Sequence, residues 1–247
     1  MPRYCLITGA SSGLGKELAL QYAAAGWNVI ALARSAQALF ELQQRHHSII
    51  PLPLDLTDFP AFSAAISQLE KNIPALDLVI LNAGSCDYVQ ADKLELNLFE
   101  RSMALNFQAQ VAAVKLLMPL LQKSSDSTLA FVSSLAHLFP FTQAEAYGAS
   151  KAALSYFADS LRVDLAGSTV RVCLIEPGFV DTPLTQKNQF DMPFLLSVDN
   201  AAQRIRLGIG LNKLRIRFPL RLVMSLHLLN LLPYTLRTKV ASRMRQQ

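Results

Sequence analysis

The sequence predicts an α/β protein: a doubly wound, seven-stranded parallel sheet with helices on both faces and a C-terminal helical extension. Short apolar runs recur along the chain, longer amphipathic stretches separate them, and a glycine-rich turn follows the first run. Short apolar runs of this kind are typical of buried strands, and parallel strands need long crossover connections. Right-handed crossovers leave a crevice at the carboxyl ends of the strands, where we expect the functional site.

The expected strands follow the apolar runs in chain order. They cover residues 4–8, 28–33, 49–54, 76–81, 128–133, 170–175 and 214–218. Gly9, Asn82, Ser134 and Pro177 each come after the end of one of these strands. Core packing alone would not require turn-forming and polar residues directly after the strands. We therefore expect these four residues to lie together at the crevice.

The first turn carries Gly9, Gly13 and Gly15 in the spacing G-x-x-x-G-x-G, and a helix is expected to begin near Gly13. Glycines let a backbone pass close to a phosphate, and the N–H groups and dipole of a helix start hold the anion. Glycines also end helices and close turns, but a place between the first strand and the first helix favours a dinucleotide cradle.

Tyr147 and Lys151 lie four residues apart in EAYGASKAAL, and Ser134 lies 13 residues upstream of the tyrosine, after an apolar run. On a helix this spacing puts the phenol and the ammonium on one face. A fixed positive charge lowers the pKa of a phenol from about 10, so the trio can move a proton to or from a carbonyl oxygen. Ser133 is the nearest alternative to Ser134, but alternation along a strand sends it to the opposite face.

The composition predicts one domain over residues 1–247, because 51% of the residues are hydrophobic and no linker or repeat interrupts them. Within it we expect a lid at about 183–212 and a hydrophobic, basic helical segment at about 219–247. The first residues lack the apolar core of a signal peptide, and the three cysteines are scattered. Both features favour a cytoplasmic protein with reduced thiols. Cysteines and histidines show no ligand spacing, so no metal site is expected.

Several ordered motifs are shared with a known family. They are TGASSGLG at 8–15, Asp55 in LDLTD, LNAG at 81–84, Asn106 in MALNFQA, Ser134, YGASK at 147–151 and PGFVDT at 177–182. Through them the chain resembles the short-chain dehydrogenase/reductase family in its single-domain, NAD(P)-dependent form. The resemblance implies a Rossmann-type fold and an oxidoreductase. Leu81, where many relatives carry Asn, and Ser85 depart from the pattern, and neither position supplies a catalytic side chain in the family.

The resemblance also implies the roles of the site residues. Tyr147 is the acid, Ser134 binds the same substrate oxygen, Lys151 also grips the nicotinamide ribose, and Asn106 holds a water that links the lysine to solvent. The expected cofactor-binding residues are Gly9, Ser11, Ser12, Gly13, Leu14, Gly15, Arg34, Asp55, Leu56, Asn82, Ala83, Gly84, Tyr147, Lys151, Pro177, Gly178, Val180 and Thr182. Asp55 either faces the adenine or caps the next helix.

The second expected strand, NVIALARS, bears on the choice of cofactor. An acidic residue at its end accepts the ribose hydroxyls of NAD, whereas a basic residue suits the 2′-phosphate of NADP. Ala33 stands at the acidic position, Arg34 follows it, and no acid occurs between Glu17 and Glu41. NADP(H) is therefore preferred over NAD(H). The alternative is that Arg34 only solvates a helix start.

The substrate is expected to be a hydrophobic ketone or aldehyde, interconverted with its alcohol. The stretches 85–92, 135–143 and 183–197 are rich in apolar residues: Leu138, Phe139, Phe141, Phe190, Met192, Phe194, Leu195 and Leu196. Lys187 is the one candidate there for binding a substrate anion. The alternative for these apolar residues is packing of the lid onto the body. The alternatives for the function are a non-catalytic nucleotide-binding scaffold or sensor, and an epimerase or dehydratase.

The last thirty residues combine an apolar run at 222–232 with basic residues at 221, 237, 239, 243 and 245, and Arg215 and Arg217 precede them. The run is too short to span a bilayer, which takes about 20 helical residues. It either covers an apolar face of the body or of a partner subunit, in a homodimer or homotetramer, or lies on an anionic membrane. The net charge of +5 comes without interleaved aromatic residues, so no nucleic-acid partner is expected.

Overall fold

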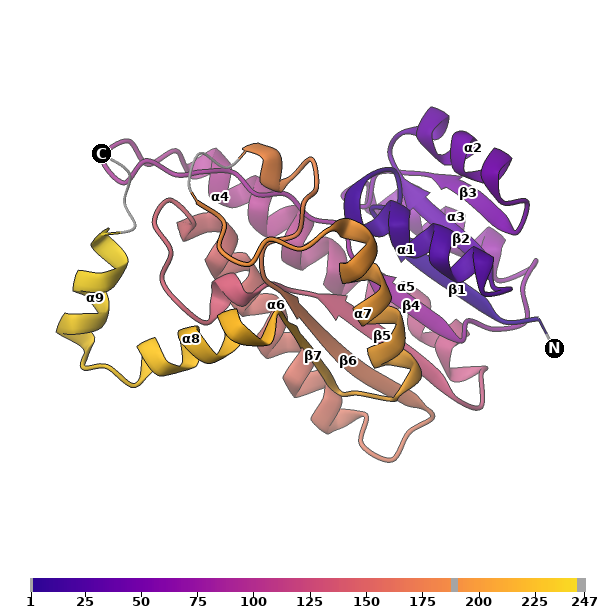
Figure 1. Ribbon diagram of the computed structural model, residues 1–247. Coiled ribbons are helices and arrows are strands. Elements are labelled where there is room, and N and C mark those ends of the chain that lie inside the picture. Colours follow the sequence, from indigo (N-terminus) through magenta and orange to yellow (C-terminus); the bar gives the residue numbers. More distant parts are fainter. Residues whose placement is uncertain (1, 188–190, 244–247) are drawn as a thin grey trace.

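The computed structural model describes residues 2–187 and 191–243 and forms one parallel sheet with helices on both faces (Figure 1). The strands are β1 (Tyr4–Thr8), β2 (Asn28–Ala33), β3 (Ile49–Pro53), β4 (Leu78–Leu81), β5 (Ser127–Val132), β6 (Val170–Pro177) and β7 (Arg215–Phe218). Their order across the sheet is β3-β2-β1-β4-β5-β6-β7, and all neighbours are parallel. The predicted fold class is confirmed, and each strand begins and ends within two residues of its expected position.

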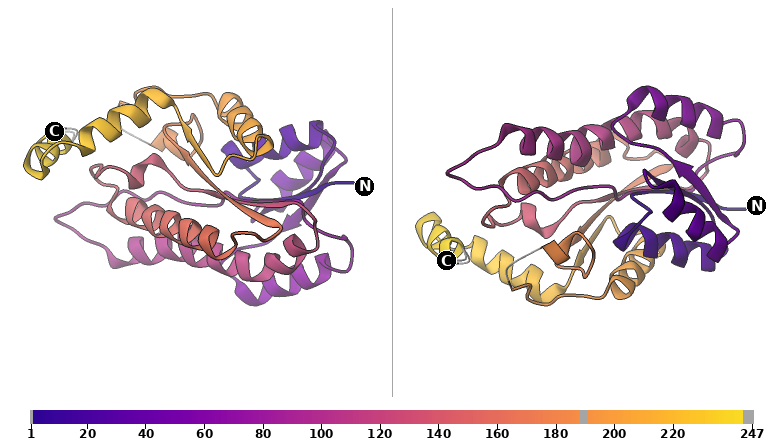
Figure 2. Two further views of the ribbon diagram at one scale, coloured as in Figure 1. Left: turned by 90° about the horizontal axis from the view of Figure 1, so that it is seen from below. Right: turned by 90° about the horizontal axis from the view of Figure 1, so that it is seen from above.

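The helices form two layers, one on each face of the sheet (Figure 2). One layer contains α1 (Gly13–Ala24), α2 (Ala36–Arg45) and α7 (Val198–Gly210), and the other contains α3 (Phe59–Leu69), α5 (Ala109–Gln122) and α6 (Glu145–Asp164). Each layer buries its own apolar cluster, because alternate strand residues point to opposite faces: Leu6 packs toward α5 and Ile7 toward α1.

A single long helix runs over Leu96–Gln122, made of α4 (Leu96–Met103), a π-helical turn η1 (Ala104–Gln108) and α5. Among the described residues it is the one helix long and apolar enough to cross a membrane, judged by length and composition. Ala113, Leu117 and Leu121 on α5 are buried in the core, so packing against the sheet accounts for this apolar character.

The chain reverses its direction across the sheet between β1 and β4. Strands β1 to β3 build outward on one side, and β4 to β7 build outward on the other. The buried Thr8 hydroxyl joins the two halves by accepting hydrogen bonds from the N–H groups of Asn82 and Ala83, both at 2.9 Å. Such a switch point opens the crevice in which doubly wound folds bind ligands.

The expected lid is only partly a surface segment. A loop with the short 3-10 helix η3 (Thr185–Lys187) leads into α7, but Ala201, Ala202 and Ile205 of α7 are fully buried. The second half of the predicted 183–212 lid is thus a core helix, because its apolar face packs beside α1.

The predicted C-terminal helical segment consists of α8 (Leu220–Asn230) and α9 (Tyr234–Arg243). Leu222, Val223 and Leu226 on one face of α8 are buried against Leu135 and Phe139. The expectation that this segment covers part of the body is confirmed for that face. Figure 1 shows the two helices reaching beyond the edge of the α/β body.

Candidate active site

A cleft of about 650 Å³ opens at the carboxyl ends of the strands. It brings together nearly all the predicted site residues: Gly9, Ser11, Ser12, Gly13, Leu14, Arg34, Asp55, Leu56, Asn82, Ala83, Gly84, Ser134, Tyr147, Lys151, Pro177, Gly178, Val180 and Thr182. Gly15 and Asn106 lie behind this lining. Residues scattered over most of the sequence therefore meet at the switch point of the sheet.

The glycine-rich turn packs directly on the end of β4. Gly9 has a φ of +69°, and a Cβ there would stand 2.9 Å from the Cα of Ala83. A Cβ on Gly15 would stand 2.3 Å from the carbonyl oxygen of Gly9. Both positions need glycine, Gly9 for its left-handed backbone and Gly15 for the close approach of α1 to the turn.

The start of α1 has the properties of an anion site. Its N-cap residue, Ser12, makes no side-chain capping bond, and the first turn carries no acid. Ser35, Asp58 and Ser197, by contrast, cap α2, α3 and α7 through their side chains. The uncapped N–H groups of α1 fit the diphosphate of a dinucleotide at the mouth of the cleft.

Ser134 and Ser133 have different environments, as strand alternation predicts. Ser133 is buried and its hydroxyl lies 2.7 Å from that of Ser155. Ser134 lines the cleft, accepts a hydrogen bond from Ala136 N at 3.1 Å and is hydrogen-bonded to the Tyr147 phenol.

The phenol of Tyr147 does not have the lowered pKa that the sequence predicts. Burial raises its pKa, the nearby Cys86 adds to the rise, and the hydrogen bond with Ser134 opposes it. The i+4 spacing does bring Lys151 near, but its Nζ donates to Val132 O at 2.8 Å and lies 5.8 Å from the centre of the phenol ring. At neutral pH the phenol is therefore protonated, which is the form that donates a proton.

Lys151 is buried beneath the cleft, and burial lowers the pKa of its ammonium to about 8. Gly84 packs close to it, since a Cβ at Gly84 would stand 3.3 Å from Nζ. At pH 7 the lysine is still mainly charged, and its ammonium lies 5.8 Å from the centre of the Tyr147 ring.

Asn106 lies in the π-helical turn η1, behind the cleft lining, and its side chain binds the neighbouring chain segments. Its Oδ1 accepts from Ser85 N, and its Nδ2 donates to Ser85 O and to Ser150 Oγ, all at 2.9 Å. These contacts fix the segment after β4 beside the helix that carries Tyr147. The predicted water-holding role of Asn106 stays a prediction.

Arg34 and Asp55 face the same end of the cleft, beyond β2 and β3. Two hydrogen bonds from Thr57 lower the pKa of the Asp55 carboxyl, and the charge of Arg34 lowers it further. The alternative that Asp55 caps the next helix is wrong, because the N-cap of α3 is Asp58. Ser35 caps α2, so Arg34 is not needed for that purpose.

The apolar residues expected at the substrate end have divided roles. Phe139 is buried, and Leu138 and Phe141 pack against the same cluster, beneath α8. Leu196 packs on the core, whereas Phe194 and Leu195 are exposed. Leu196 therefore packs the lid onto the body, as the alternative expects, whereas Leu138, Phe139 and Phe141 pack with the C-terminal helix α8. Phe190 and the side chain of Lys187 lie outside the part of the chain that is described.

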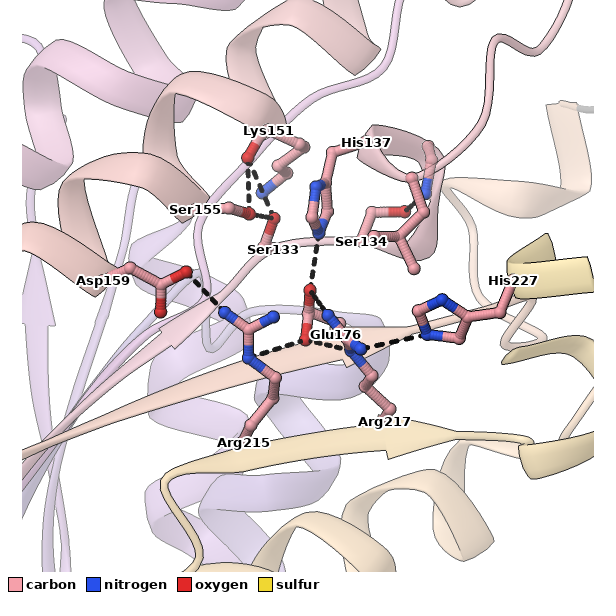
Figure 3. A network of polar contacts seen from close by, with 12 residues as sticks. Ser133, Ser134, His137, Lys151, Ser155, Asp159, Glu176, Arg215, Arg217 and His227 are labelled. Carbon is pink, nitrogen blue, oxygen red and sulfur yellow. Dashed lines mark hydrogen bonds and ion pairs between the residues drawn. The ribbon is translucent and has the colours of Figure 1, made fainter. Parts of the chain in front are cut away.

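A buried carboxylate next to the cleft is absent from the sequence-based site. Glu176 is fully buried at the end of β6, one residue before Pro177 (Figure 3). Its Oε1 lies 2.5 Å from Nε2 of His137, and its Oε2 accepts from Arg217 Nε at 2.7 Å. Arg215 Nε stands 3.6 Å away. The signal in the sequence that could have revealed it is an acid directly after the apolar run Val172–Ile175, in a strand whose other charged residue is Arg171.

Glu176 links two parts of the cleft. His137 lies three residues after Ser134, and Pro177 and Gly178 follow Glu176 in the turn that lines the cleft. His227 of α8 extends the network, with Nε2 3.2 Å from Arg217 Nη1. The carboxylate thus ties the segment after the serine to β7 and the C-terminal helices.

Glu176→Gln should destabilise the fold by about 3–5 kcal/mol at pH 7, because it removes the charge that pairs with Arg217 and Arg215 in a buried site. Burial raises the pKa of Glu176, but the hydrogen bonds from His137 and Arg217 and the charges of both arginines outweigh it, so the folded pKa lies below the ordinary value. The stability that this carboxylate contributes is present above the unfolded pKa of about 4.3 and is lost as pH falls through the folded pKa.

Urea unfolding of both proteins at pH 7 and below pH 4 measures this difference, which should shrink in acid. Glu100→Gln is the matched control, since Glu100 is exposed on α4, and it should change stability by less than about 0.5 kcal/mol. A gap between the wild type and Glu176→Gln that is equal at both pH values would contradict the ion pairing.

The described residues contain no group of three or more His, Cys, Asp or Glu side chains placed to hold a metal ion.

Known proteins share these features. The sequence pattern of the family described as short chain dehydrogenase matches residues 3–192. An uncharacterized oxidoreductase of Myxococcus xanthus is 37% identical over 247 residues, with 98% of each chain covered. The structure of Pseudomonas aeruginosa RhlG with NADP is 28% identical, covers 74% of this chain and 75% of that chain, and has a TM-score of 0.70.

A second solved structure agrees over a longer stretch. The Burkholderia phymatum short chain dehydrogenase/reductase, in complex with NAD, has a TM-score of 0.84 over 93% of both chains, at 18% identity. At that identity the likeness shows the fold alone. The two structures bind different dinucleotides, NAD in one and NADP in the other. The preference of this protein must therefore be argued from its own residues.

Proposed function

Because the chain belongs to the short-chain dehydrogenase/reductase family, as a dehydrogenase/reductase acting on CH–OH groups, we propose that it is an NADP(H)-dependent carbonyl reductase for hydrophobic ketones or aldehydes. The reverse reaction is oxidation of the corresponding alcohol. The observation that carries the cofactor choice is Arg34, an exposed cation at the end of β2 that lines the cleft.

The charge pattern around Arg34 supports NADP(H). No Asp or Glu occurs between Glu17 and Glu41, and the buried Ala33 stands where an acid would accept the ribose hydroxyls. A guanidinium binds a phosphate with two parallel hydrogen bonds, and the 2′-phosphate is what distinguishes NADP from NAD. Asp55 is near, but its carboxylate oxygen Oδ1 is already engaged by Thr57.

The protein's part in the reaction is to hold the substrate oxygen and protonate it. Bound NADPH supplies the hydride. Ser134 and Tyr147 both line the cleft and are hydrogen-bonded to each other, so both hydroxyls can bind one carbonyl oxygen and stabilise the charge that develops on it. Tyr147 then gives its proton to that oxygen, and the Lys151 ammonium stabilises the phenolate left behind.

The state of the phenol supports reduction at neutral pH. Its raised pKa keeps the proton on Tyr147, ready for a carbonyl oxygen. Oxidation of an alcohol instead needs the phenolate, which burial disfavours. The apolar character of the substrate is inferred from the segment that follows Val180, in which Leu184 lines the cleft and Phe194 and Leu195 are exposed before α7.

Arg34→Ala should raise the Kd for NADPH by about tenfold to a hundredfold and leave that for NADH unchanged. The reason is the loss of one charge-assisted phosphate contact, about 1.5–3 kcal/mol, which NADH cannot make. Titration of purified wild type and variant with each nucleotide, followed by nicotinamide fluorescence, measures both constants without any substrate.

Arg45→Ala is the control, because Arg45 is an exposed arginine at the other end of α2, outside the cleft. It should bind both nucleotides as the wild type does. Equal affinity of the wild type for NADH and NADPH would overturn the cofactor proposal, and binding of neither would overturn the oxidoreductase proposal.

A further inference from the structure

The outward side of the C-terminal helices carries an apolar stripe. Leu220, Met224 and Leu228 on α8 and Leu231 just after it are spaced four, four and three residues apart, and so share one helical face. Their side chains are 67% to 81% exposed. We call these four residues the outer stripe. The opposite face of α8 is already buried against the body, so the helix has two apolar faces and the body covers one.

Helix α9 continues this surface. None of its residues is buried, and Tyr234 and Leu236 are exposed apolar side chains. Both views in Figure 2 show α8 and α9 extending from one end of the molecule, away from the two helix layers. The two helices have 11 and 10 residues, about half of what a bilayer span requires. They can lie along a surface but cannot cross it.

The charge of the segment is entirely of one sign. From residue 200 to the end of the sequence there is no Asp or Glu. Arg221, Lys239 and Arg243 are exposed on α8 and α9, and Arg237 lies over the ring of Tyr234, with its guanidinium carbon 5.1 Å from the ring centre. Basic side chains beside an exposed apolar face are typical of helices that lie in a membrane interface.

This charge argues against a second copy of the chain as the occupant. In a two-fold interface the same patch meets itself, so the cations of α8 and α9 would face one another with no acid in the segment to offset them. An anionic surface complements the segment along its whole length. We propose that α8 and α9 bind the surface of an anionic lipid bilayer, with the outer stripe inserted at the boundary of headgroups and acyl chains.

The contacts of α8 connect this surface to the cleft. Leu222 packs so near Gly178 that a Cβ on the glycine would stand 2.7 Å from it. Asn230 Nδ2 donates to Leu138 O at 2.7 Å, in the segment after Ser134. A bilayer bound to the outer stripe is therefore separated from Gly178 in the cleft lining by the thickness of one helix, roughly 10 Å, which brings the cleft near an apolar substrate held in the lipid. This last step rests on the proposed function, whereas the binding of lipid does not.

Vesicle sedimentation without cofactor or substrate tests the binding alone. The full chain is mixed with vesicles of phosphatidylcholine, or with vesicles in which about a third of the lipid is phosphatidylglycerol. The protein should sediment with the anionic vesicles and much less with the neutral ones, and added salt should release it, since surface charges are screened over about 10 Å at 0.1 M salt. Sedimentation with neither kind of vesicle, or equal sedimentation with both kinds, would overturn the proposal.

Two variants separate the apolar and the charged contributions. Met224→Glu combined with Leu228→Glu should lower the partition coefficient on anionic vesicles at least tenfold, by placing charges in the outer stripe. Lys239→Gln combined with Arg243→Gln should lower it about fivefold for each cation removed. Leu207→Glu on α7 is the matched control, an equally drastic change at an exposed leucine outside the segment, and it should bind as the wild type does.

Each variant should keep the NADPH affinity of the wild type, because the substituted side chains point to solvent and lie outside the cleft. Sedimentation of the glutamate variant equal to that of the wild type would overturn the proposal. So would light scattering that shows a lipid-free dimer of the wild type which the glutamate variant abolishes, since the outer stripe would then be a subunit interface.

Discussion

Tyr147→Phe is expected to lower kcat for carbonyl reduction by about 10²- to 10⁴-fold, the range that a positioned general acid contributes. The phenol is hydrogen-bonded to Ser134 at the cleft, and the buried Lys151 ammonium lies 5.8 Å from the centre of its ring. Phenylalanine keeps the ring and its packing but has no proton to give. The Kd for NADPH should change little, because the substitution leaves the anion site at α1 and the proposed phosphate contact of Arg34 unchanged.

Tyr156→Phe is the matched control for this experiment. Tyr156 lies on the same helix, its side chain is 80% exposed, and the same oxygen atom is removed. It should leave both kcat and the NADPH affinity unchanged. Steady-state NADPH consumption with a panel of apolar carbonyl compounds measures the rates, and nicotinamide fluorescence measures the affinity. Turnover by Tyr147→Phe at the wild-type rate would show that Tyr147 is not the general acid.

Gly15→Ala should destabilise the protein by about 1–3 kcal/mol or more and weaken NADPH binding at least about tenfold. The added methyl group would stand 2.3 Å from Gly9 O and 2.5 Å from Asn82 Nδ2. The first of these is a backbone atom in a turn that already packs on Ala83, so it has no free direction in which to move. Either α1 or the turn must shift, and the anion site lies between them.

Gly210→Ala provides the comparison, because a Cβ at Gly210 meets nothing within 4 Å and its backbone is not left-handed. Urea unfolding and NADPH titration should show it equal to the wild type or slightly more stable, as alanine favours helix over glycine. If Gly15→Ala bound NADPH as tightly as Gly210→Ala, the close approach of α1 to the turn would have no part in cofactor binding.

The fold and most of the cleft lining could be predicted because their signals are local. Apolar runs mark the strands, and Gly9, Asn82 and Ser134 stand directly after them. The i+4 spacing put Tyr147 and Lys151 on one helix face without any knowledge of the tertiary structure. Alternation along β5 separated Ser134 from Ser133 for the same reason.

What could not be predicted depends on partners distant in the sequence. Glu176 meets His137, 39 residues before it, and Arg217, 41 residues after it. The pKa of Tyr147 was expected to fall because of Lys151, but the burial of both groups and the bond from Lys151 to Val132 O reverse the expectation. Phe139 was expected at the substrate end because nothing local shows that α8 returns to cover it.

The way α8 sits on the body affects how the protein can be cut or fused. A chain ended before Leu220 would uncover Leu135 and Phe139 and would remove the neighbour of Gly178. Trimming the last helices to improve solubility would thus expose new apolar surface and loosen two walls of the cleft. The C-terminal helices are not a removable appendage, and a tag or fusion partner belongs at the other end of the chain, where Arg3 lies at the surface.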